Sequence, residues 1–333
     1  MPLNHRILLA ARPSGPAGPE CFSVIEEPAP EPGPGQALVR VEYLSIDPTI
    51  RGWMDRDTYL PAIPVGEVIR SGAAGEVVAS KHPAYPVGSR AFGLLGWQEY
   101  ALVGDGAAEA MPLPDGLTLE DALSVYGTTG LTAYFGIFDI GHPEPGETFV
   151  VSGAAGGVGS IAGQIAKHVV GCRVIGIAGS PEKCRWVVDD LGFDACIDYK
   201  AEDVPARLAE LCPDGIDVYF DNVGGPILDA VLAHLALRAR IVACGAISQY
   251  NDLDHGYGVR NLFALISQRG RMEGFILLDY LDRFLDGVLE LATWVQEGKV
   301  RSRVDVVEGL EHAPEALDRL FTGANLGKVI VRL

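Results

Sequence analysis

The sequence has few cysteines and no paired cysteine motif. Its six cysteines are spread over 333 residues, without a CxxC pair or a dense cluster: Cys21, Cys172, Cys184, Cys196, Cys212 and Cys244. A small secreted fold held by disulfides is therefore not expected, and we predict reduced, mostly buried thiols. The regular spacing of Cys172, Cys184 and Cys196 is interpreted as chance, because each lies in a separate strand or helix pattern.

Long hydrophobic runs and blocks of positive charge are also missing. No apolar segment approaches the length that crosses a bilayer, and the first residues, MPLNHRILLA, lack the long apolar core of a secretory signal. Twenty-six Lys and Arg stand against 44 Asp and Glu, a net charge of −18. This balance disfavours nucleic acid and anionic membranes as partners. We expect a cytoplasmic protein.

The hydrophobic residues that are present suffice for two domains. Residues 1–125 alternate short β-rich pieces with Pro/Gly turns, which predicts a small, mostly antiparallel β domain. Over residues 126–303, strand-like runs alternate with helical segments, which is typical of a parallel sheet covered by helices on both faces. Residues 304–333 contain one helix-like run and a final strand, KVIVRL, which we expect to pair with the first domain. The predicted class is α/β.

The stretch VVSGAAGGVGS, residues 150–160, joins a predicted strand to a predicted helix. Glycines let the backbone turn sharply and approach a pyrophosphate, while the N-terminal N–H groups of the helix point at the phosphates. The alternative is a plain glycine-rich turn, but the second strand that follows, RVIGIA, favours a Rossmann dinucleotide site. The candidate cofactor-binding residues of this loop are Gly153, Gly156, Gly157, Val158 and Gly159.

The end of the second strand indicates which dinucleotide is bound. An NAD-preferring site usually has an Asp or Glu there for the ribose 2′-OH, but this chain has Ala178, Gly179 and Ser180. Ser180 can donate a hydrogen bond to a phosphate, and Lys183 and Arg185 follow within one or two helical turns. Taken alone, these two cations would be ordinary solvated charges on a helix. Their position after the strand favours NADP(H) over NAD(H).

Nine ordered segments extend the pattern over nearly the whole chain: SIDPTIRGWM, YGTTGLTAYFG, VSGAAGGVGS, AGSPEKC, IDYK, DVYFDNVGG, ACGAISQYN, RMEGFI and GANLGKVIV. With them the chain resembles the zinc-free medium-chain reductases, in the leukotriene B4 dehydrogenase, prostaglandin reductase, plant double-bond reductase and bacterial curcumin reductase family. The resemblance implies a GroES-like catalytic domain, a Rossmann domain that binds NADPH, and reduction of an activated C=C bond in a cleft between them. It also implies a homodimer, for which the strand MEGFILLDY is a candidate sheet edge.

The resemblance further implies cofactor contacts outside the glycine loop. On the side of the 2′-phosphate and the ribose they would be Gly179, Ser180, Lys183, Tyr199 and Asn222. On the nicotinamide side they would be Cys244, Tyr250, Phe275 and Asn325. For Tyr199 and Phe275, the alternative is half-buried packing at strand ends.

A catalytic zinc is not expected. The first domain contains Cys21, His5 and His82 without partners at metal-ligand spacing, and the four-cysteine lobe of zinc alcohol dehydrogenases is absent. Without a metal, the natural reaction is hydride transfer from NADPH to the β-carbon of an α,β-unsaturated ketone or aldehyde. Tyr250 is the candidate catalytic donor to the enolate oxygen. The alternative is that Tyr250 packs against the cofactor or closes its own loop.

Four residues are candidate substrate contacts: Thr49, Arg51, Glu67 and Tyr257. Where many relatives read Asp-Pro-Tyr-Met-Arg, this chain reads DPTIR at 47–51, and Glu67 replaces a tyrosine of plant-type relatives. Glu67 could instead be a surface residue paired with Arg70. Arg51 could orient a substrate carboxylate, although we favour a structural role for it.

The leading function is therefore an NADPH-dependent enone or alkenal double-bond reductase. A quinone reductase would use the same cofactor site but would need no positioned proton donor. An alcohol dehydrogenase would oxidise a secondary alcohol with NADP⁺, and a crystallin-like protein would bind the cofactor without catalysis. In the catalytic cases, the partner is a small enone, enal, quinone or alcohol.

Overall fold

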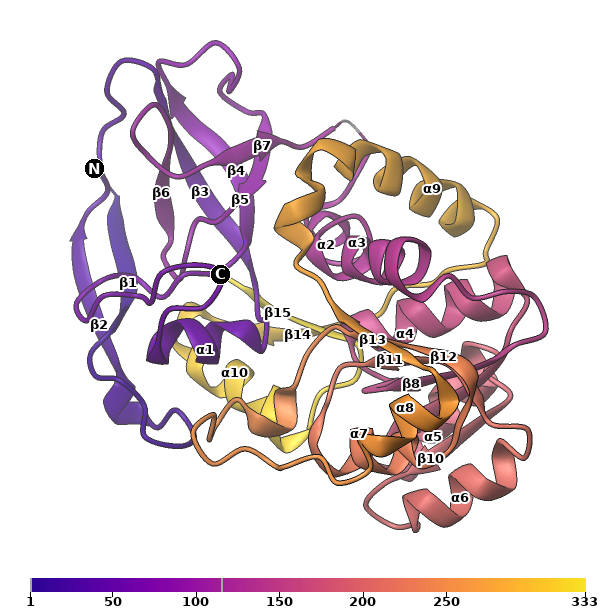
Figure 1. Cartoon of the computed structure of the whole chain (residues 1–333). Helices are drawn as coiled ribbons and strands as arrows, with labels where there is room; N and C mark the ends of the chain where they lie inside the picture. Colours follow the sequence, from indigo (N-terminus) through magenta and orange to yellow (C-terminus); the bar gives the residue numbers. More distant parts are fainter. Residues whose placement is uncertain (1, 115) are drawn as a thin grey trace. The chain divides into compact units, whose positions relative to one another are not determined.

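The computed structural model describes residues 2–114 and 116–333. The chain divides into two compact units (Figure 1). Each unit has its own hydrophobic core. One unit comprises Met1–Leu123, Val304–Asn325 and Val329–Leu333, and the other comprises Ser124–Arg303 and Leu326–Lys328. Among the described helices, none has both the length and the apolar character that a membrane crossing requires.

The first unit is an antiparallel β structure with three α-helices. Its strands are β1 (Leu3–Leu9), β2 (Phe22–Pro28), β3 (Gln36–Ser45), β4 (Ala73–Ser80), β5 (Arg90–Gly93), β6 (Tyr100–Gly104), β7 (Ala110–Pro112), β14 (Val304–Glu308) and β15 (Lys328–Arg332). Its helices are α1 (Thr49–Asp55), α2 (Leu119–Leu123) and α10 (Ala313–Thr322). β1 pairs with β2, and the other strands form one sheet in the order β14-β15-β3-β4-β5-β7, with β6 beside β3.

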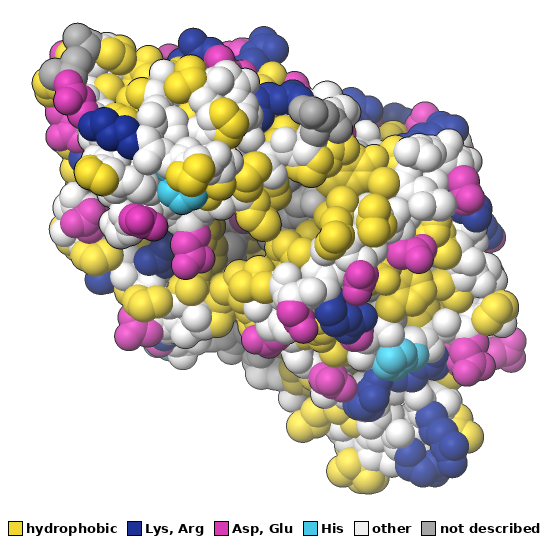
Figure 2. All heavy atoms as spheres, turned by 90° about the horizontal axis from the view of Figure 1, so that it is seen from above, with side chains coloured by type: hydrophobic (Ala, Val, Ile, Leu, Met, Phe, Trp, Pro, Cys, Tyr) yellow, Lys and Arg dark blue, Asp and Glu magenta, His cyan; other side chains and the backbone are white. Residues whose placement is uncertain are grey.

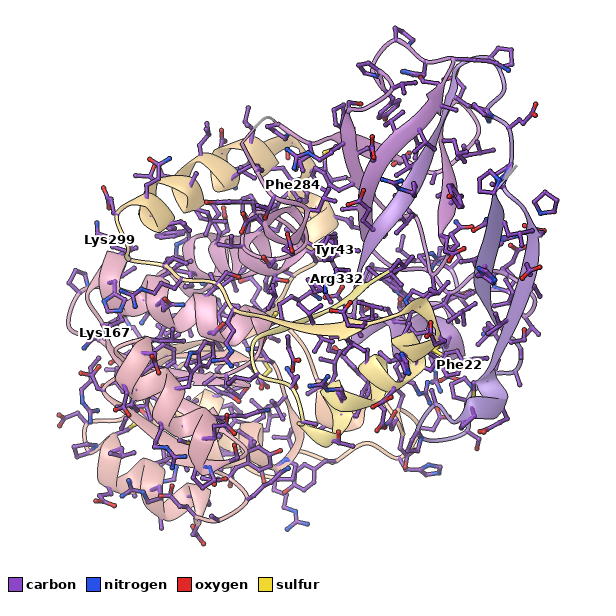
Figure 3. The ribbon with its side chains drawn as sticks, turned by 180° about the vertical axis from the view of Figure 1, so that it is seen from behind. Phe22, Tyr43, Lys167, Phe284, Lys299 and Arg332 are labelled. Atoms are coloured by element: carbon purple, nitrogen blue, oxygen red, sulfur yellow. The ribbon has the colours of Figure 1, made fainter. Side chains whose placement is uncertain are left out.

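The C-terminal strand returns to this sheet as predicted. β15 pairs antiparallel with β3, which places Arg332 opposite Tyr43 (Figure 3). Sequence analysis missed β14, which precedes the predicted helix α10. Its residues, VDVVE, are exposed or half-buried, so the strand lacks the clean alternation of buried and polar residues that a strand pattern requires.

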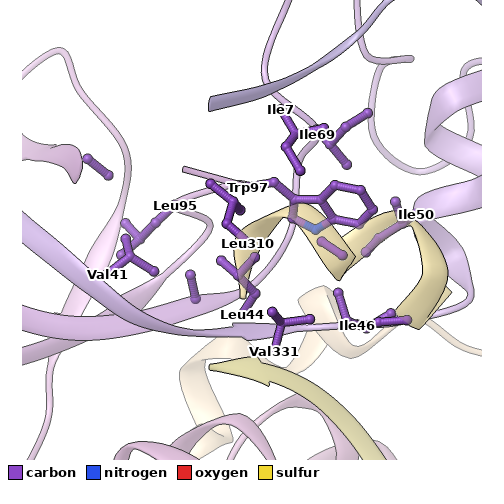
Figure 4. Close-up of a cluster of buried hydrophobic side chains, with 14 of the residues drawn as sticks. Ile7, Val41, Leu44, Ile46, Ile50, Ile69, Leu95, Trp97, Leu310 and Val331 are labelled. Atoms are coloured by element: carbon purple, nitrogen blue, oxygen red, sulfur yellow. The ribbon is translucent and has the colours of Figure 1, made fainter. Parts of the chain in front are cut away.

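The core of the first unit is built around large apolar side chains. Trp97 is fully buried, stacks on Phe22 with 5.7 Å between ring centroids, and lies among residues that include Ile7, Ile50 and Ile69 (Figure 4). Burying an aromatic ring of this size removes a large apolar area from water, which makes Trp97 a structural residue of this unit.

The second unit is a six-stranded parallel sheet, which confirms the predicted α/β class. Its strands are β8 (Thr148–Ser152), β9 (Arg173–Ala178), β10 (Ala195–Asp198), β11 (Ile216–Asp221), β12 (Leu235–Ala243) and β13 (Arg271–Gly274). Its helices are α3 (Thr128–Phe135), α4 (Gly157–Gln164), α5 (Pro181–Arg185), α6 (Val204–Leu211), α7 (Gly225–Leu232), α8 (Phe263–Gln268) and α9 (Phe284–Gln296). The strand order is β10-β9-β8-β11-β12-β13.

Both faces of this sheet are covered. Successive residues of β8 alternate between two cores, because Phe149 and Val151 pack on one face and Val150 packs on the other. The chain builds β8, β9 and β10 outward in one direction and then returns to the other side of β8 with β11. Open sheets bind their ligands outside the carboxyl ends of the strands at such a switch point. We therefore expect a ligand site at the carboxyl ends of β8 and β11.

Candidate functional site

The glycine loop follows β8 at the switch point. Gly153 has φ = 60°, a left-handed conformation that glycine adopts without strain. A Cβ on Gly157 would lie 2.7 Å from Thr129 Cγ2, and a Cβ on Gly159 would collide with the carbonyl oxygen of Gly153. Gly156 caps the N-terminus of α4, and Val158 is the second residue of that helix. The glycines thus let the backbone segments of the loop approach each other at the N-terminus of α4, the positive end of the helix dipole. A pyrophosphate site requires such an arrangement.

The predicted 2′-phosphate residues lie together after β9 and β10. The Ser180 side-chain oxygen accepts a hydrogen bond from Lys183 N at 3.2 Å, so Ser180 is the N-cap of α5. A Cβ on Gly179 would lie 2.7 Å from the ring of Tyr199, so the ring packs over this glycine. Tyr199 remains 42% exposed, and Lys200 Nζ lies 5.9 Å from its ring centroid. No carboxylate belongs to the segment 178–180.

A buried carboxylate that sequence analysis missed organises the end of β11. Asp221 Oδ1 accepts hydrogen bonds from Ser152 Oγ (3.0 Å), Tyr219 OH (2.8 Å), Val223 N (3.0 Å) and Gly224 N (2.9 Å). Burial raises the pKa of Asp221, and these hydrogen bonds oppose the rise. A signal was present in the sequence, since an acidic residue directly follows the apolar run VYF of β11 and precedes NVGG.

The same network fixes the predicted ribose residue. Asn222 N donates to Ser152 Oγ at 2.9 Å, and Asn222 Nδ2 donates to the Ser152 carbonyl at 2.7 Å. Asp221 and Ser152 therefore hold Asn222 at the end of β11, beside the end of β8. The side chain of Asn222 also lies near Gly153, where an added Cβ would be 3.4 Å from Asn222 Cβ.

The loop after β12 carries Cys244 and Tyr250. Cys244 N and Gly245 N both donate to the Asp221 carbonyl at 3.0 Å, which ties this loop to β11. Burial and the Asp221 charge raise the pKa of the Cys244 thiol to about 12, so the thiol is protonated at neutral pH. The Tyr250 hydroxyl accepts a hydrogen bond from Ala246 N at 3.1 Å. This bond closes the loop, as the structural alternative for Tyr250 required, and it also fixes the direction of the phenol.

Two more predicted cofactor residues lie in different units. Phe275 follows β13 in the second unit and packs edge-on against Tyr280, with 6.3 Å between ring centroids. Asn325 is 7% exposed and belongs to the first unit, next to Leu326–Lys328 of the second. Within the second unit, Gly327 N donates to the Ala155 carbonyl of the glycine loop at 2.8 Å.

Thr129 is a second residue that sequence analysis did not single out. Its side chain touches the glycine loop at Gly157 and is 3% exposed. Its hydroxyl has no hydrogen-bond partner among the described residues. A buried polar group usually has a partner, so this hydroxyl is available to a ligand held by the loop.

Tyr257 is positioned by another acidic residue that the sequence did not reveal. Its hydroxyl donates to Asp229 Oδ2 at 3.0 Å, and Arg260 N and Asn261 N both donate to Asp229 Oδ1 at 2.8 Å. Burial opposes ionisation of Asp229, but the hydrogen bonds from Asn261, Arg260 and Tyr257 prevail and lower its pKa. Asp229 thus anchors the 257–261 segment to α7.

The three substrate candidates of the first unit have unrelated partners. Thr49 Oγ1 is 2.8 Å from the Tyr59 hydroxyl. Arg51 is buried, and its Nε and Nη2 donate to the Gly15 carbonyl at 3.1 and 2.7 Å; burial lowers the pKa of Arg51. Glu67 is exposed.

The expected alternative for Glu67, a pair with Arg70, is wrong. Arg70 Nη1 donates to the Pro61 carbonyl at 2.8 Å, and its guanidinium lies 5.6 Å from the Trp53 ring centroid. In the described ranges no ion pair joins Glu67 to Arg70. The packing of Arg70 on an aromatic ring explains the difference, because a guanidinium gains from stacking as well as from charge pairing.

The possible metal donors of the first unit are each used elsewhere. His5 contacts Glu99 (2.8 Å) and Glu26 (3.0 Å), which together raise its pKa. His82 Nδ1 is 3.0 Å from Ala84 N, and Cys21 is buried with a raised pKa. Over residues 2–114 and 116–333, no three His, Cys, Asp or Glu side chains are grouped as metal ligands. This donor set does not fit a tetrahedral zinc site.

All six cysteines are free, but two of them are not independent. Interaction between the thiols of Cys184 in α5 and Cys196 in β10 lowers the pKa of Cys184 and raises that of Cys196. The spacing in sequence gave no reason for these thiols to converge, but α5 follows β9 and packs on β10, which places them in the same region.

Comparisons with known proteins agree with the two units. A model described as "N-terminal domain of oxidoreductase" matches residues 5–111, and one described as "Zinc-binding dehydrogenase" matches residues 157–294. The NADPH-dependent curcumin reductase of Escherichia coli (strain K12) is 43% identical, with 99% of this chain and 97% of that protein covered. The 2-alkenal reductase (NADP(+)-dependent) of Nicotiana tabacum is 40% identical, with 90% and 88% covered.

Solved structures give the same result. CurA from Vibrio vulnificus in complex with NADPH superposes with a TM-score of 0.93 at 42% identity, and the match covers 98% of each chain. At this identity and coverage, the similarity extends over nearly the whole chain.

Proposed function

Because the chain belongs to the zinc-free medium-chain dehydrogenase/reductase family, as an NADP-dependent oxidoreductase, we propose that it reduces the C=C bond of α,β-unsaturated ketones and aldehydes. The observation that carries the proposal is the end of β9, where Ser180 and Lys183 stand in place of an acidic residue. That arrangement accepts a 2′-phosphate, and relatives with this cofactor act on curcumin and on 2-alkenals.

The second unit fits NADP(H) in two respects. The glycines after β8 leave a cradle that a Cβ would fill, and the buried Thr129 hydroxyl lacks a partner there in the described part of the chain. We propose that Gly153, Gly156, Gly157, Val158 and Gly159 hold the pyrophosphate, that Gly179, Ser180, Lys183 and Tyr199 hold the 2′-phosphate, and that Asn222 holds the ribose. Cys244, Tyr250, Phe275 and Asn325 complete the nicotinamide side. When bound, this cofactor supplies a hydride.

Tyr250 is the proposed catalytic residue. Addition of hydride to the β-carbon leaves negative charge on the substrate carbonyl oxygen, and a neutral phenol can donate a hydrogen bond to it. The hydrogen bond from Ala246 N to the Tyr250 oxygen helps to orient the ring, and we assign the phenol O–H as the donor to the enolate. The phenol proton is then passed on to the α-carbon of the enolate, which completes the saturated product.

Substitution of Tyr250 by Phe tests this role. We expect kcat for enones and enals to fall by about 10²–10³-fold, the usual loss for one oxyanion donor, while the Kd for NADPH stays unchanged. A panel of enones, enals, quinones and secondary alcohols separates the alternatives. Quinone turnover should survive the substitution, because a quinone needs no positioned donor.

The control is Tyr100→Phe, which removes the hydroxyl of a half-buried tyrosine in the first unit and should leave all rates unchanged. If Tyr250→Phe left enone turnover unchanged, Tyr250 would not be catalytic. If wild-type protein turned over only quinones or only alcohols, the double-bond reductase proposal would fail.

We also propose that the reaction needs no zinc. The support is the donor set, since His5, His82 and Cys21 are engaged in separate contacts. Enone reduction should be unchanged after dialysis against a chelator, with metal content measured by mass spectrometry. Loss of activity that zinc restores would contradict this proposal.

For the substrate side, we propose Thr49, Arg51, Glu67 and Tyr257 as the residues around the enone. Tyr257 and Thr49 have hydroxyl contacts to Asp229 and Tyr59 that hold them in place. We assign the catalytic domain to residues 1–125 and 304–333 and the NADP(H)-binding domain to residues 126–303. Exchange of Glu67 for Tyr should shift the KM of bulky enones without changing the Kd for NADPH.

We propose that the protein is a homodimer joined at β13. This strand ends the parallel sheet, all four of its residues are exposed, and an unpaired edge strand is a template for pairing with a second copy. Exposed apolar side chains also lie on α8, which packs on the neighbouring strand β12, namely Phe263 (73%) and Ile266 (71%), and on α9, namely Leu285 (67%). Figure 2 shows hydrophobic side chains gathered on the face where α9 lies. Such patches mark protein interfaces.

Sedimentation of Ile266→Lys measures this interface. We expect a monomer, whereas Val87→Lys, which changes an equally exposed apolar residue of the first unit (65%), should remain dimeric. Wild-type protein that sediments as a monomer at micromolar concentration would refute the proposal.

The free state of all six cysteines supports a reducing compartment, and we propose the cytoplasm, to be checked by fractionation.

A further inference from the structure

A charged hollow lies at the ends of the parallel strands that are opposite to the glycine loop. Its volume is about 460 Å³, within the range of ligand pockets. It lies at the amino ends of the strands, since Glu147 directly precedes β8, while Gly153 follows the other end of that strand. The lining residues are His142, Glu144, Glu147, Arg238, Arg240, Arg269 and Arg271.

The backbone around this hollow is unusual. The described chain has three non-glycine residues with positive φ, and all three line the hollow: His142 (42°), Arg238 (63°) and Arg269 (53°). This conformation costs free energy for a residue with a side chain and persists only where the surroundings impose it. Arg238 lies in an irregularity of β12. Ile216 of β11 pairs with Leu235, but Val218, only two residues later, pairs with Arg240. Bulges of this kind redirect side chains.

Two of the arginines form the fixed floor. Arg240 donates to both carboxylate oxygens of Glu147 (2.8 and 2.5 Å) and to the carbonyls of Gly141 and His142. Arg271, opposite Arg240 in the β12/β13 register, donates to the Ile140 carbonyl at 2.5 Å. Glu147 neutralises Arg240 and has a lowered pKa: burial opposes its ionisation, but the hydrogen bonds from Arg240 and from Glu144 N, together with the charge of Arg240, outweigh the effect of burial. The floor is therefore rigid and satisfied.

The other two arginines carry charge that is not neutralised. Arg238 and Arg269 are exposed, and neither makes an ion pair within the described ranges. Glu147 offsets the charge of Arg240, and Glu273, next to the lining, pairs with Arg271 at 3.5 Å. Among the lining residues this leaves Arg238 and Arg269 as the cations without an ion pair, with Glu144 as the remaining carboxylate. In a chain of net charge −18, two such cations in one hollow form a local electropositive site.

From this geometry we propose that the hollow binds a small multivalent oxyanion of the phosphate class, held between the guanidinium groups of Arg238 and Arg269. Guanidinium forks match phosphate oxygens with two parallel hydrogen bonds, and two forks converging on one hollow select an anion with at least two charges. The Arg240–Glu147 pair and the Arg271–Ile140 bond hold the floor beneath it. The site is separate from the cofactor loop and does not depend on the proposed reaction.

Calorimetric titration with inorganic pyrophosphate tests the site. The protein is first saturated with NADPH, which occupies the glycine loop and prevents pyrophosphate from binding there. We expect one pyrophosphate per chain in the wild type, and at least a tenfold weaker Kd in Arg238→Gln and in Arg269→Gln. Both side chains are exposed, so both variants should fold, and their enone kcat should match the wild type.

The matched control is Arg332→Gln, which removes an exposed arginine of the first unit that is paired with Glu308. It lowers the net charge by the same amount and should bind pyrophosphate as the wild type does. Absence of binding to the NADPH-saturated wild type would overturn the proposal. Equal affinity in the Arg238, Arg269 and Arg332 variants would overturn it as well, because binding would then reflect overall charge.

Discussion

The candidate residues of the two units differ in how they are held. In the second unit they lie at the carboxyl ends of β8, β9, β11 and β12, and Asp221 links three of these strand ends or the loops that follow them. In the first unit, Thr49, Arg51 and Glu67 have unrelated partners. A parallel sheet aligns strand ends from distant parts of the sequence, whereas a turn residue is positioned only by its own neighbours. The residues proposed for the cofactor are therefore held as a unit, whereas those of the first unit proposed for the substrate are held singly.

The strongest way to break this unit is Asp221→Ala. Four neutral donors would lose their common acceptor, so we expect the free energy of unfolding to fall by at least about 1–3 kcal/mol, the cost of leaving a buried donor without an acceptor. The Kd for NADPH should rise in the protein that remains folded. Urea unfolding measures the first effect and cofactor fluorescence the second. Asp214→Ala, at an exposed position, is the control and should change neither.

Lys183→Ala probes the cofactor preference of the second unit without disturbing its fold. Loss of a charged hydrogen bond of about 1.5–3 kcal/mol should weaken NADPH binding by about 10–100-fold. NADH binding should be unchanged, because the lysine is assigned to the 2′-phosphate. An equal loss for both dinucleotides would place Lys183 elsewhere in the site.

Arg51→Met tests whether Arg51 of the first unit contributes to stability independently of NADPH binding. The Gly15 carbonyl would lose its two donors, so the free energy of unfolding should fall by about 1–3 kcal/mol. The Kd for NADPH should stay constant. A large rise in KM for substrates with a carboxylate, with no change in thermal unfolding, would instead support the substrate role of Arg51.

Within the second unit, the thiols differ in pKa and therefore in reactivity. Hydrogen bonding from Cys196 lowers the pKa of Cys184, whereas burial raises the pKa of Cys172 to about 12 and of Cys212 to about 11. At pH 8, iodoacetamide should therefore label Cys184 at least tenfold faster than Cys172 or Cys212, because the thiolate is the nucleophile. Peptide mass spectrometry measures the order. Cys196→Ser should slow the labelling of Cys184 if the hydrogen bond is responsible.

The smallest effect is expected for Glu67→Gln. An exposed carboxylate without an ion pair in the described ranges contributes within about 0.5 kcal/mol to stability. The NADPH Kd should not change, and any effect should appear in the KM of the enone alone. A change in thermal unfolding of several degrees would show a structural contact at Glu67.

The sequence was sufficient for the features that depend on local pattern. Strand β8, the glycine spacing and the helix α4 lie within residues 148–164, so the chemistry of the loop could be predicted without tertiary information. β14 was missed because its residues are at most half-buried and show no period. Asp221 and Asp229 were missed because their importance comes from donors that lie up to 69 residues away, such as Ser152 for Asp221.

The three residues Leu326–Lys328 belong to the second unit, whereas the residues on either side belong to the first. Gly327 supplies a hydrogen bond to Ala155 and bridges Gly156 in parallel. A segment that follows every strand of the parallel sheet in the sequence therefore completes the glycine loop, which lies about 170 residues earlier. Removal of residues 326–333 would take β15 from the first unit and this contact from the second, so that one deletion would damage both units together.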